Sequence, residues 1–420
     1  MSLDLSVPPR RLAAPGTPAG RPGPSLAEGV RTAGVPLRAF VCSRLIVLLA
    51  GVGGVLSVAK HAPAAAVSAS MRQLGAVGYV LAGSADRFDA GYYLDIAKHG
   101  YGSLASGRAA FFPLYPLLIR VLTFFTRSDV AAAVAISAVS FLLALVLLHR
   151  LTELELGRRA ADATVLLLAF SPLSFFFTAV YTESLFLLLS VATVLMARRG
   201  KWELACVLAS LATLTRPTGV LLVVALVIIR LLSLRRVDRR LAWALLPPAA
   251  LLGYMGTLAA NSYPWLAPFH AESSFGRVSS GPIVGVAAGL WSAIRGVGQL
   301  ATGQASIYHP TLSGPFSTSA ESVVLFTVLV LAGIALWSCR RRLMPAYAAY
   351  GAAALLMCVS SPAQGQPLWS LDRYVMTIFP LWMVAGAWVA RRRLEVPAIV
   401  LGSILLVFYT VQFSSWSFVA

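Results

Sequence analysis

The sequence predicts an all-α, polytopic membrane protein with about eleven transmembrane helices. Its mean hydropathy is +0.78, and 58% of its 420 residues are hydrophobic. Only 12% are charged, about half the share found in soluble domains. The basic residues gather in short runs between apolar stretches, which is the pattern of cytoplasmic loops. Membrane topology therefore accounts for the net charge of +18, and we expect no binding of nucleic acid.

The predicted elements begin with a polar tail and continue with a single membrane domain. Residues 1–37 are rich in Pro, Gly, Ala and Arg and contain no apolar run, which predicts a disordered cytoplasmic tail. Residues 38–420 form the membrane domain, with a large first outer loop over about 60–129 and further outer loops over about 261–320 and 362–373. The expected spans are 39–59, 130–148, 164–180, 184–197, 203–215, 217–234, 241–260, 321–338, 343–361, 374–390 and 396–418.

The segment Ala109–Phe125 decides the topology. It is apolar enough to be a span, but two prolines and Arg120 interrupt it. If it crosses the membrane, the basic runs at Arg198 and Arg235 fall outside the cell, against the positive-inside rule. If it lies in the outer interface, both runs fall in the cytoplasm. We therefore expect an interfacial segment, a multi-pass protein of the cell membrane, and a site on its extracytoplasmic face.

The densest polar stretch of the chain follows the first predicted span. It predicts one short helix with Asp86 as its N-cap, in which Asp89 and Tyr93 share a face and Asp95 pairs with His99. These residues could serve only to cap and pair the helix. Ionisable groups gathered beside a bilayer are, however, typical of functional sites, and this favours a site here.

Arg87–Tyr101 (RFDAGYYLDIAKHGY) resembles the RWDA…Y…IA..GY motif that follows the first span of the PIG-V family. This family contains the second mannosyltransferase of GPI-anchor assembly and its bacterial relatives. Three later segments agree with it in order: 111–117 (FFPLYPL), 171–184 (SPLSFFFTAVYTES) and 372–380 (DRYVMTIFP). Two positions depart from the family pattern, because Phe88 replaces the usual Trp and Asp372 replaces a Pro.

The resemblance implies the GT-C fold, a multi-span helical enzyme that takes a sugar from a polyprenyl-phosphate donor with inversion. Such a transfer needs a carboxylate to accept the proton of the attacking hydroxyl, and the resemblance implies that Asp89 is this base. It also needs cations that stabilise the departing phosphate. Arg373 is the first candidate for this role, followed by Arg216, Arg87 and His99.

Tyr93, Asp95 and Glu183 complete the set of expected substrate-binding residues. Glu183 follows an aromatic run and either positions the acceptor sugar or simply ends a helix in water. Arg216 precedes Pro217 and either faces the site or extends toward the interface as a structural arginine. We expect neither a metal nor a cofactor, because the 4 cysteines lack ligand spacing and no dense acidic cluster occurs.

The leading interpretation is a mannosyltransferase that uses a polyprenyl-phosphate-mannose donor, a glycolipid or glycan acceptor, and membrane lipid as its surroundings. The same fold could instead use another lipid-linked sugar, such as glucose or arabinose. From a different class, the chain could be a transporter or flippase. Transporters often contain internal repeats and charges at the middle of the membrane, and the sequence shows no such repeat.

Overall fold

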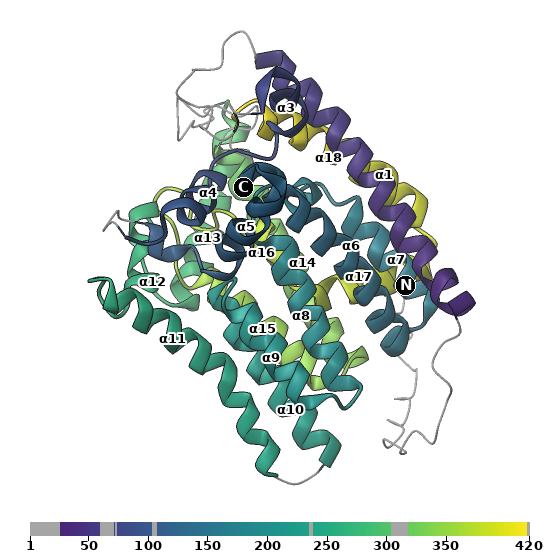
Figure 1. The fold of residues 1–420 in the computed structure, drawn as a ribbon. Coiled ribbons are helices and arrows are strands. Elements are labelled where there is room, and N and C mark those ends of the chain that lie inside the picture. Colours follow the sequence, from purple (N-terminus) through teal and green to yellow (C-terminus); the bar gives the residue numbers. More distant parts are fainter. Residues whose placement is uncertain are drawn as a thin grey trace.

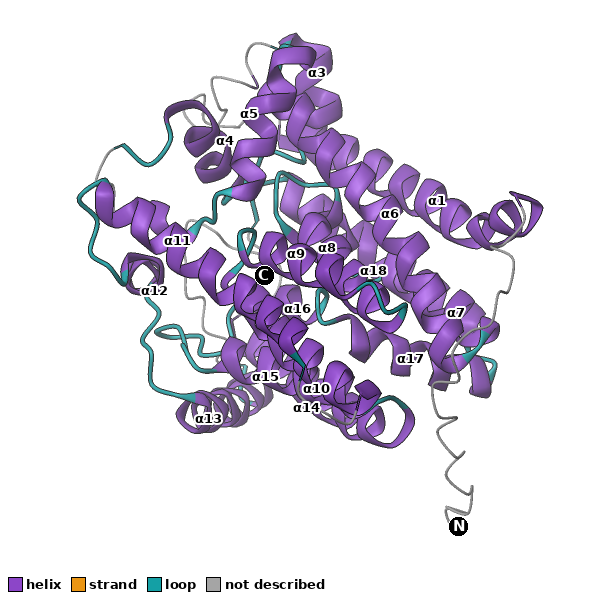
Figure 2. Ribbon diagram, turned by 60° about the horizontal axis from the view of Figure 1, so that its bottom comes forward, coloured by secondary structure: helices purple, strands orange, loops and turns teal. Residues whose placement is uncertain are grey.

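The computed structural model describes residues 26–58, 71, 74–102, 107–234, 238–303 and 318–417. These residues form helices joined by loops, without a strand among them (Figure 2). The all-α prediction is therefore confirmed. The α-helices are α1 (Leu26–Val58), α3 (Gly75–Ala82), α4 (Ala90–His99), α5 (Leu114–Thr126), α6 (Asp129–Leu156), α7 (Arg158–Ala169), α8 (Glu183–Arg198), α9 (Trp202–Thr213), α10 (Leu222–Leu234), α11 (Leu246–Ala260), α12 (Ala267–His270), α13 (Pro282–Ala301), α14 (Thr318–Arg342), α15 (Pro345–Val359), α16 (Leu371–Val375), α17 (Phe379–Arg392) and α18 (Glu395–Ser414).

The helices pack around α6, α7 and α8. Helix α6 contacts α1, α7 and α8, and α17 covers another side of α7. The first and last long helices, α1 and α18, lie side by side along one edge of the molecule (Figure 1). This contact brings the end of α18 close to the polar stretch that follows α1.

Seven of the described helical segments are long and apolar enough to cross a membrane. Three shorter apolar helices, α5, α9 and α15, accompany them. A polytopic membrane protein is thus confirmed, whereas the number of eleven spans stays a prediction. The seven segments are Gly34–Val58, Asp129–Leu156, Pro217–Leu234, Arg239–Ala260, Pro282–Ala301, Thr318–Arg342 and Glu395–Ser414.

Helix α1 starts inside the predicted tail, because it begins at Leu26 rather than near residue 38. Residues 26–35 contain Leu, Ala, Glu and Arg, which favour helix, and Pro36 lies inside the helix. Residues 1–25 of the predicted disordered tail lie outside the described part of the chain.

The predicted span 164–180 is wrong as a continuous helix. Helix α7 ends at Ala169, and Pro172 follows, which cannot donate a helical hydrogen bond. A short 3-10 helix, Ser174–Phe177, then leads toward α8. The guanidinium of Arg44 in α1 bonds two carbonyl groups at this break. Its Nη1 donates to the carbonyl of Ser174 (2.8 Å) and its Nη2 to that of Ala169 (3.4 Å).

Helix α13 lies inside the segment that was predicted to be the outer loop 261–320. It is long and apolar enough to be a span, so this loop prediction was incomplete. Glycines allow it to approach its neighbours closely. A Cβ added at Gly285 would lie 1.7 Å from the carbonyl oxygen of Val359, and one at Gly296 would lie 2.5 Å from that of Ser319. Helix α13 therefore packs against the end of α15 and the start of α14.

Helix α5 covers most of the segment that decides the topology. It has 13 residues and a length of about 20 Å, less than the roughly 30 Å of a hydrocarbon core. Tyr115 and Ile119 are buried, whereas Phe124 and Phe125 are exposed on the other side. A helix that is too short to span the membrane, with one buried side and one exposed apolar side, favours the predicted interfacial position of Ala109–Phe125.

Candidate active site

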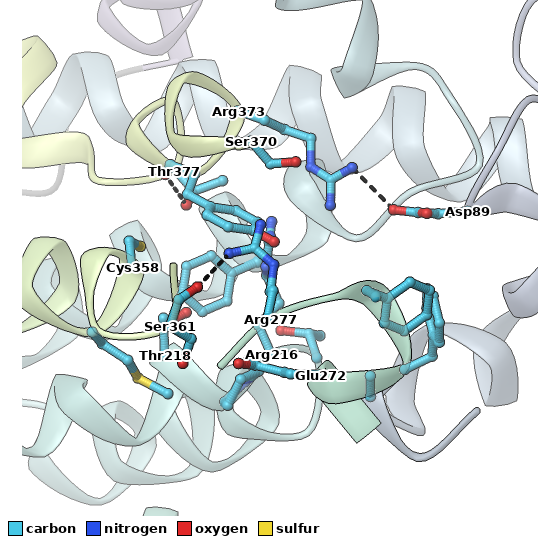
Figure 3. A pocket seen from close by; sticks show the side chains of 18 of the residues that line it. Asp89, Arg216, Thr218, Glu272, Arg277, Cys358, Ser361, Ser370, Arg373 and Thr377 are labelled. Carbon is cyan, nitrogen blue, oxygen red and sulfur yellow. Dashed lines mark hydrogen bonds and ion pairs between the residues drawn. The ribbon is translucent and has the colours of Figure 1, made fainter. Parts of the chain in front are cut away.

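A cavity of about 460 Å³ lies where the segment around α4 meets the loops after α9, α12 and α15 (Figure 3). This volume falls within the usual range of small-molecule pockets. Its lining residues come from parts of the chain that are far apart in sequence: 88–93, 110–111, 186, 215–218, 272–277, 350–361 and 369–378. The predicted residues Asp89, Tyr93, Arg216 and Arg373 all line it.

The polar stretch around Asp89 folds differently from the prediction at its start. Helix α4 begins at Ala90, so Asp89 and not Asp86 precedes it, and Asp89 makes no side-chain capping bond. The prediction that Asp86 is the N-cap is therefore wrong. At the other end, Gly100 ends the helix with φ +68°, as its lack of a side chain allows.

A strained turn aims Asp89 at the cavity. Phe88 has φ +52°, a left-handed conformation that costs a non-glycine residue about 1–2 kcal/mol. The hydroxyl of Tyr181 holds both sides of this turn. It accepts a hydrogen bond from the backbone N–H of Asp89 (3.2 Å) and donates one to the carbonyl of Arg87 (3.1 Å). Tyr181, which is not among the predicted site residues, thus supports the turn from both sides.

Four charged side chains form a continuous network at the cavity. Arg373 Nη1 lies 3.0 Å from Asp89 Oδ2, and Arg373 Nε lies 3.1 Å from Glu183 Oε1. Arg216 Nη1 contacts the same oxygen of Glu183 at 3.0 Å. The Nε contact of Arg373 is an ion pair without hydrogen-bond geometry, and among the described atoms Glu183 Oε2 has no hydrogen-bond partner. The structure therefore brings together the predicted acid and two of the three predicted arginines, with Glu183 between Arg216 and Arg373.

Burial alone would lower the pKa of Arg373, but Glu183 and Asp89 outweigh it and raise this pKa above its ordinary value. The guanidinium stays charged as a result. It also lies over the rings of Tyr181 and Tyr374, 5.2 and 5.4 Å from their centroids. With the ring of Phe176, 5.4 Å from the guanidinium carbon, Arg373 is held by two carboxylates and three aromatic rings.

A third arginine of the cavity, Arg277, was missed by the sequence analysis. Its Nη1 donates to the carbonyl of Ser361 (3.1 Å) and its Nη2 to the carbonyl of Trp369 (2.7 Å). Its guanidinium carbon and that of Arg216 lie 5.6 and 5.1 Å from the ring centroid of Tyr374. Arg277 lies in the predicted outer loop 261–320, outside any motif, so only its position as a charged residue in that loop could have signalled it.

The wall that carries Arg277 consists of two paired loops. Residues 276–281 and 360–364 run side by side and are joined through their backbones. The bonds run from the N–H of Val278 to Pro362 O (3.1 Å), Ser280 to Ser360 O (3.1 Å), Gly281 to Ser360 O (3.0 Å) and Gln364 to Gly276 O (2.9 Å).

Aromatic side chains line the side of the cavity that is formed by α4. Tyr92 stacks on Phe111 with their centroids 4.5 Å apart, and Phe275 meets Tyr92 edge-on at 5.8 Å. The hydroxyl of Tyr93 lies 3.3 Å from that of Thr182. Burial raises the pKa of Tyr93 above its ordinary value, so this hydroxyl stays protonated.

Four of the predicted substrate-binding residues do not line the cavity: Glu183, which contacts Arg216 and Arg373 behind the lining, and Arg87, Asp95 and His99. Arg87 is buried, and its Nε and Nη2 bond the carbonyl of Ser414 at the end of α18 (3.2 and 3.1 Å). Asp95 pairs with His99 (2.8 Å), as the sequence predicted, and also with Arg108. Arg87 contacts the end of α18, and the Asp95–His99 pair lies on a part of α4 that does not line the cavity. The structure therefore gives these residues structural contacts in place of the expected substrate contacts.

Among the described residues, no group of three His, Cys, Asp or Glu side chains is arranged to hold a metal ion. The absence of a metal and of a cofactor stays a prediction.

Comparison with known protein families gives a match over part of the chain. Residues 37–235 match the family model described as mannosyltransferase (PIG-V). The resemblance drawn from the motifs is confirmed. The matched range contains Asp89, Glu183 and Arg216, whereas the 372–380 segment with Arg373 lies beyond it.

Curated relatives match over a similar region. The GPI mannosyltransferase 2 of Yarrowia lipolytica is 40% identical over 90 residues, which are 21% of this chain and 25% of that protein. The GPI alpha-1,6-mannosyltransferase 2 of Rattus norvegicus is 33% identical over 197 residues, 43% of this chain and 39% of that protein. The chain thus covers well under two thirds of the length of either relative.

A solved structure resembles nearly the whole chain. The oligosaccharyltransferase of Archaeoglobus fulgidus in its apo form gives a TM-score of 0.50 at 16% identity, over 94% of this chain and 57% of that one. At this identity the likeness concerns the fold alone. It agrees with the GT-C-type helical membrane fold that the motifs implied.

Proposed function

We propose that the protein is an integral membrane mannosyltransferase that moves mannose from a polyprenyl-phosphate-mannose donor to a hydroxyl of a glycolipid or glycan acceptor. One observation carries this proposal: the cavity places Asp89, the acid of the family motif, beside arginines from three other parts of the chain. A sugar transfer from a phosphate needs this combination of a base and cations. The curated relatives of the first half of the chain are mannosyltransferases, which supports the choice of sugar.

Asp89 has one carboxylate oxygen committed and one available. Oδ2 contacts Arg373 at 3.0 Å, and among the described residues Oδ1 has no recorded partner. We assign Oδ1 to the acceptor hydroxyl. Asp89 takes the hydroxyl proton while the oxygen attacks the anomeric carbon from the side opposite the phosphate. The bond from carbon to phosphate oxygen breaks, its electron pair leaves with the polyprenyl phosphate, and the configuration at the carbon inverts.

Arg373 then acts first as the residue that orients the base. Its contacts with Asp89 and Glu183 fix the carboxylate relative to the cavity. Its expected role as a ligand of the donor phosphate stays a prediction, as does the role of Arg216. Glu183, with 1% of its surface exposed, is enclosed too deeply to be a second base and serves to hold both arginines.

The helix directions support an extracytoplasmic site. Helix α8 starts at the cavity with Glu183 and ends in Arg198, and α17 starts beside it and ends in Arg391 and Arg392. Helix α14 ends in Arg340–Arg342, and α15 returns from that turn to the cavity at Cys358. The basic runs therefore lie at the ends of these helices that are remote from the cavity. By the positive-inside rule these ends are cytoplasmic, and the cavity faces outward.

The test is a transfer assay with purified protein in proteoliposomes. Polyprenyl phosphates that carry mannose, glucose or arabinose are supplied with candidate acceptor glycolipids, and the products are identified by mass spectrometry. We expect transfer of mannose, and a loss of about 10²–10⁴-fold in Asp89→Asn. Asp95→Asn, whose side chain lies outside the cavity, is the matched control and should keep most activity.

Each competing function gives a different result in this assay. Transfer of glucose or arabinose in place of mannose would change the donor but keep the mechanism. Movement of the lipid across the bilayer without any glycosidic product would identify a flippase and refute the enzyme. Near-normal transfer by Asp89→Asn would remove Asp89 as the base. The physiological acceptor follows from mass analysis of the glycolipids that lose mannose when the gene is deleted.

A further inference from the structure

The three arginines of the cavity differ in how their charges are balanced. Arg373 lies within 3.1 Å of two carboxylates, those of Asp89 and Glu183. Arg216 shares Glu183 with it. In the described part of the chain, Arg277 forms no ion pair: its side-chain hydrogen bonds go to two backbone carbonyls. It is thus the cavity arginine whose charge is least compensated.

The guanidinium of Arg277 is held in place and still has donors to offer. An arginine carries five N–H donors, and the two bonds to Ser361 and Trp369 use one each from Nη1 and Nη2. The ring of Tyr374 lies 5.6 Å from the guanidinium carbon and limits its movement. A cation that is fixed by neutral groups, with unused N–H donors in a cavity, suits an anion with several oxygens.

Glu272 also lines the cavity, and its negative charge opposes the binding of an anion there. No arginine or lysine nitrogen of the described residues lies within 4.0 Å of its carboxylate, so it does not neutralise Arg277 by direct contact. An anion beside Arg277 gains a charge-assisted contact that Glu272 does not occupy.

We infer that Arg277 binds the phosphate of the lipid-linked donor and of the polyprenyl phosphate that leaves. This inference rests on the proposed function for the identity of the lipid. The donor phosphodiester carries one negative charge, and the leaving monoester carries up to two, so the contact strengthens as the sugar is transferred. Arg277 is a substrate-binding residue by this assignment, and Arg373 remains the residue that orients Asp89.

The experiment measures binding without acceptor or sugar. The full-length protein in nanodiscs is titrated with farnesyl phosphate and, separately, with farnesol, which has the same chain without the phosphate. Quenching of tryptophan fluorescence reports binding, since Trp369 lines the cavity. We expect wild type to prefer farnesyl phosphate, and Arg277→Gln to weaken its binding roughly 10–100-fold without changing that of farnesol.

Three further variants separate phosphate binding from a structural role of Arg277. Arg295→Gln removes an exposed cation of α13 outside the cavity and should leave both affinities unchanged. Glu272→Gln removes a negative charge from the cavity and should keep or tighten the binding of farnesyl phosphate. Arg277→Lys retains the charge and should retain part of the preference for phosphate. If Arg277→Lys and Arg277→Gln weaken both ligands equally, Arg277 only joins the two loops and the inference is refuted.

The two proposals fail in different ways. If wild type has no preference for farnesyl phosphate, or if Arg277→Gln keeps it, the phosphate assignment is wrong even where mannosyl transfer is observed. If the preference depends on Arg277 but no sugar is transferred, the phosphate site stands and the transferase is refuted.

Discussion

Replacing Tyr181 with phenylalanine tests whether the turn before Asp89 controls the site. The change keeps the ring and removes one hydroxyl, which accepts from the N–H of Asp89 (3.2 Å) and donates to the carbonyl of Arg87 (3.1 Å). Each bond contributes about 0.5–1.5 kcal/mol, so both together contribute about 1–3 kcal/mol. These bonds oppose the roughly 1–2 kcal/mol of strain at Phe88. Without them the turn relaxes, and Asp89 leaves its position opposite Arg373.

The expected result is a fall in kcat at saturating donor of roughly 5–150-fold, the factor that corresponds to 1–3 kcal/mol. Tyr115→Phe is the matched control. Its hydroxyl is also buried and lies within hydrogen-bond distance of Ala133 O (3.1 Å) and Ser137 Oγ (2.8 Å), but it does not touch the turn. Both variants should lower the thermal midpoint, and only Tyr181→Phe should lower kcat. If kcat of Tyr181→Phe equals that of wild type, or if both variants lose it equally, the reasoning is refuted.

Three further predictions address orientation, topology and pH. Arg373→Lys should lose transfer roughly tenfold or more while the protein still inserts, because one ammonium cannot contact both Asp89 and Glu183. If Arg373→Lys matches the activity of wild type at low and at saturating donor, Arg373 is only an anchor. Ser128→Cys, in a background without native cysteines, should react with an impermeant thiol reagent from outside the cell. Labelling only after permeabilisation would place Ser128 in the cytoplasm and contradict the predicted topology. Burial raises the pKa of Asp372 to about 7, so the folded protein keeps a proton that the unfolded chain releases above about pH 4. Stability should therefore fall as pH rises through this window, and Asp372→Asn should flatten that fall in thermal midpoint; an unchanged slope would contradict this.

Hydropathy and motifs predicted well which segments of the chain form the site. They predicted less well which side chains of those segments face the cavity. Asp89, Arg216 and Arg373, which were predicted from the sequence, line the cavity, and Glu183 lies between the two arginines, a position that the motifs did not indicate. These residues lie at helix starts and in loops, which the pattern of apolar runs locates well.

The direction of single side chains depended on details that the sequence does not display. A helix that starts at Ala90 instead of Asp86, after a left-handed Phe88, sends Arg87 to the end of α18. Arg277 was not predicted, because its place is set by backbone pairing between two loops more than 80 residues apart, for which no local pattern exists.

Two spans were also misjudged for physical reasons. The stretch 164–180 is mostly apolar, which predicts a span, but the helix breaks there, and Arg44 from α1 bonds the carbonyls at the break. Glycines interrupt the apolar run of α13 in the sequence, and polar segments flank it, so hydropathy alone predicts a loop there. Its glycines instead provide its packing surface against α14 and α15.

The paired loops 276–281 and 360–364 also affect how this protein can change in evolution. Because main-chain atoms join the two loops, the other side chains of these loops can be substituted without displacing Arg277. Under the proposed function, an acceptor that approaches across the wall meets this surface, whereas Asp89, Arg216 and Arg373 belong to other segments. If the proposed function is right, substitutions on this wall should change the acceptor before they change the chemistry of the transfer.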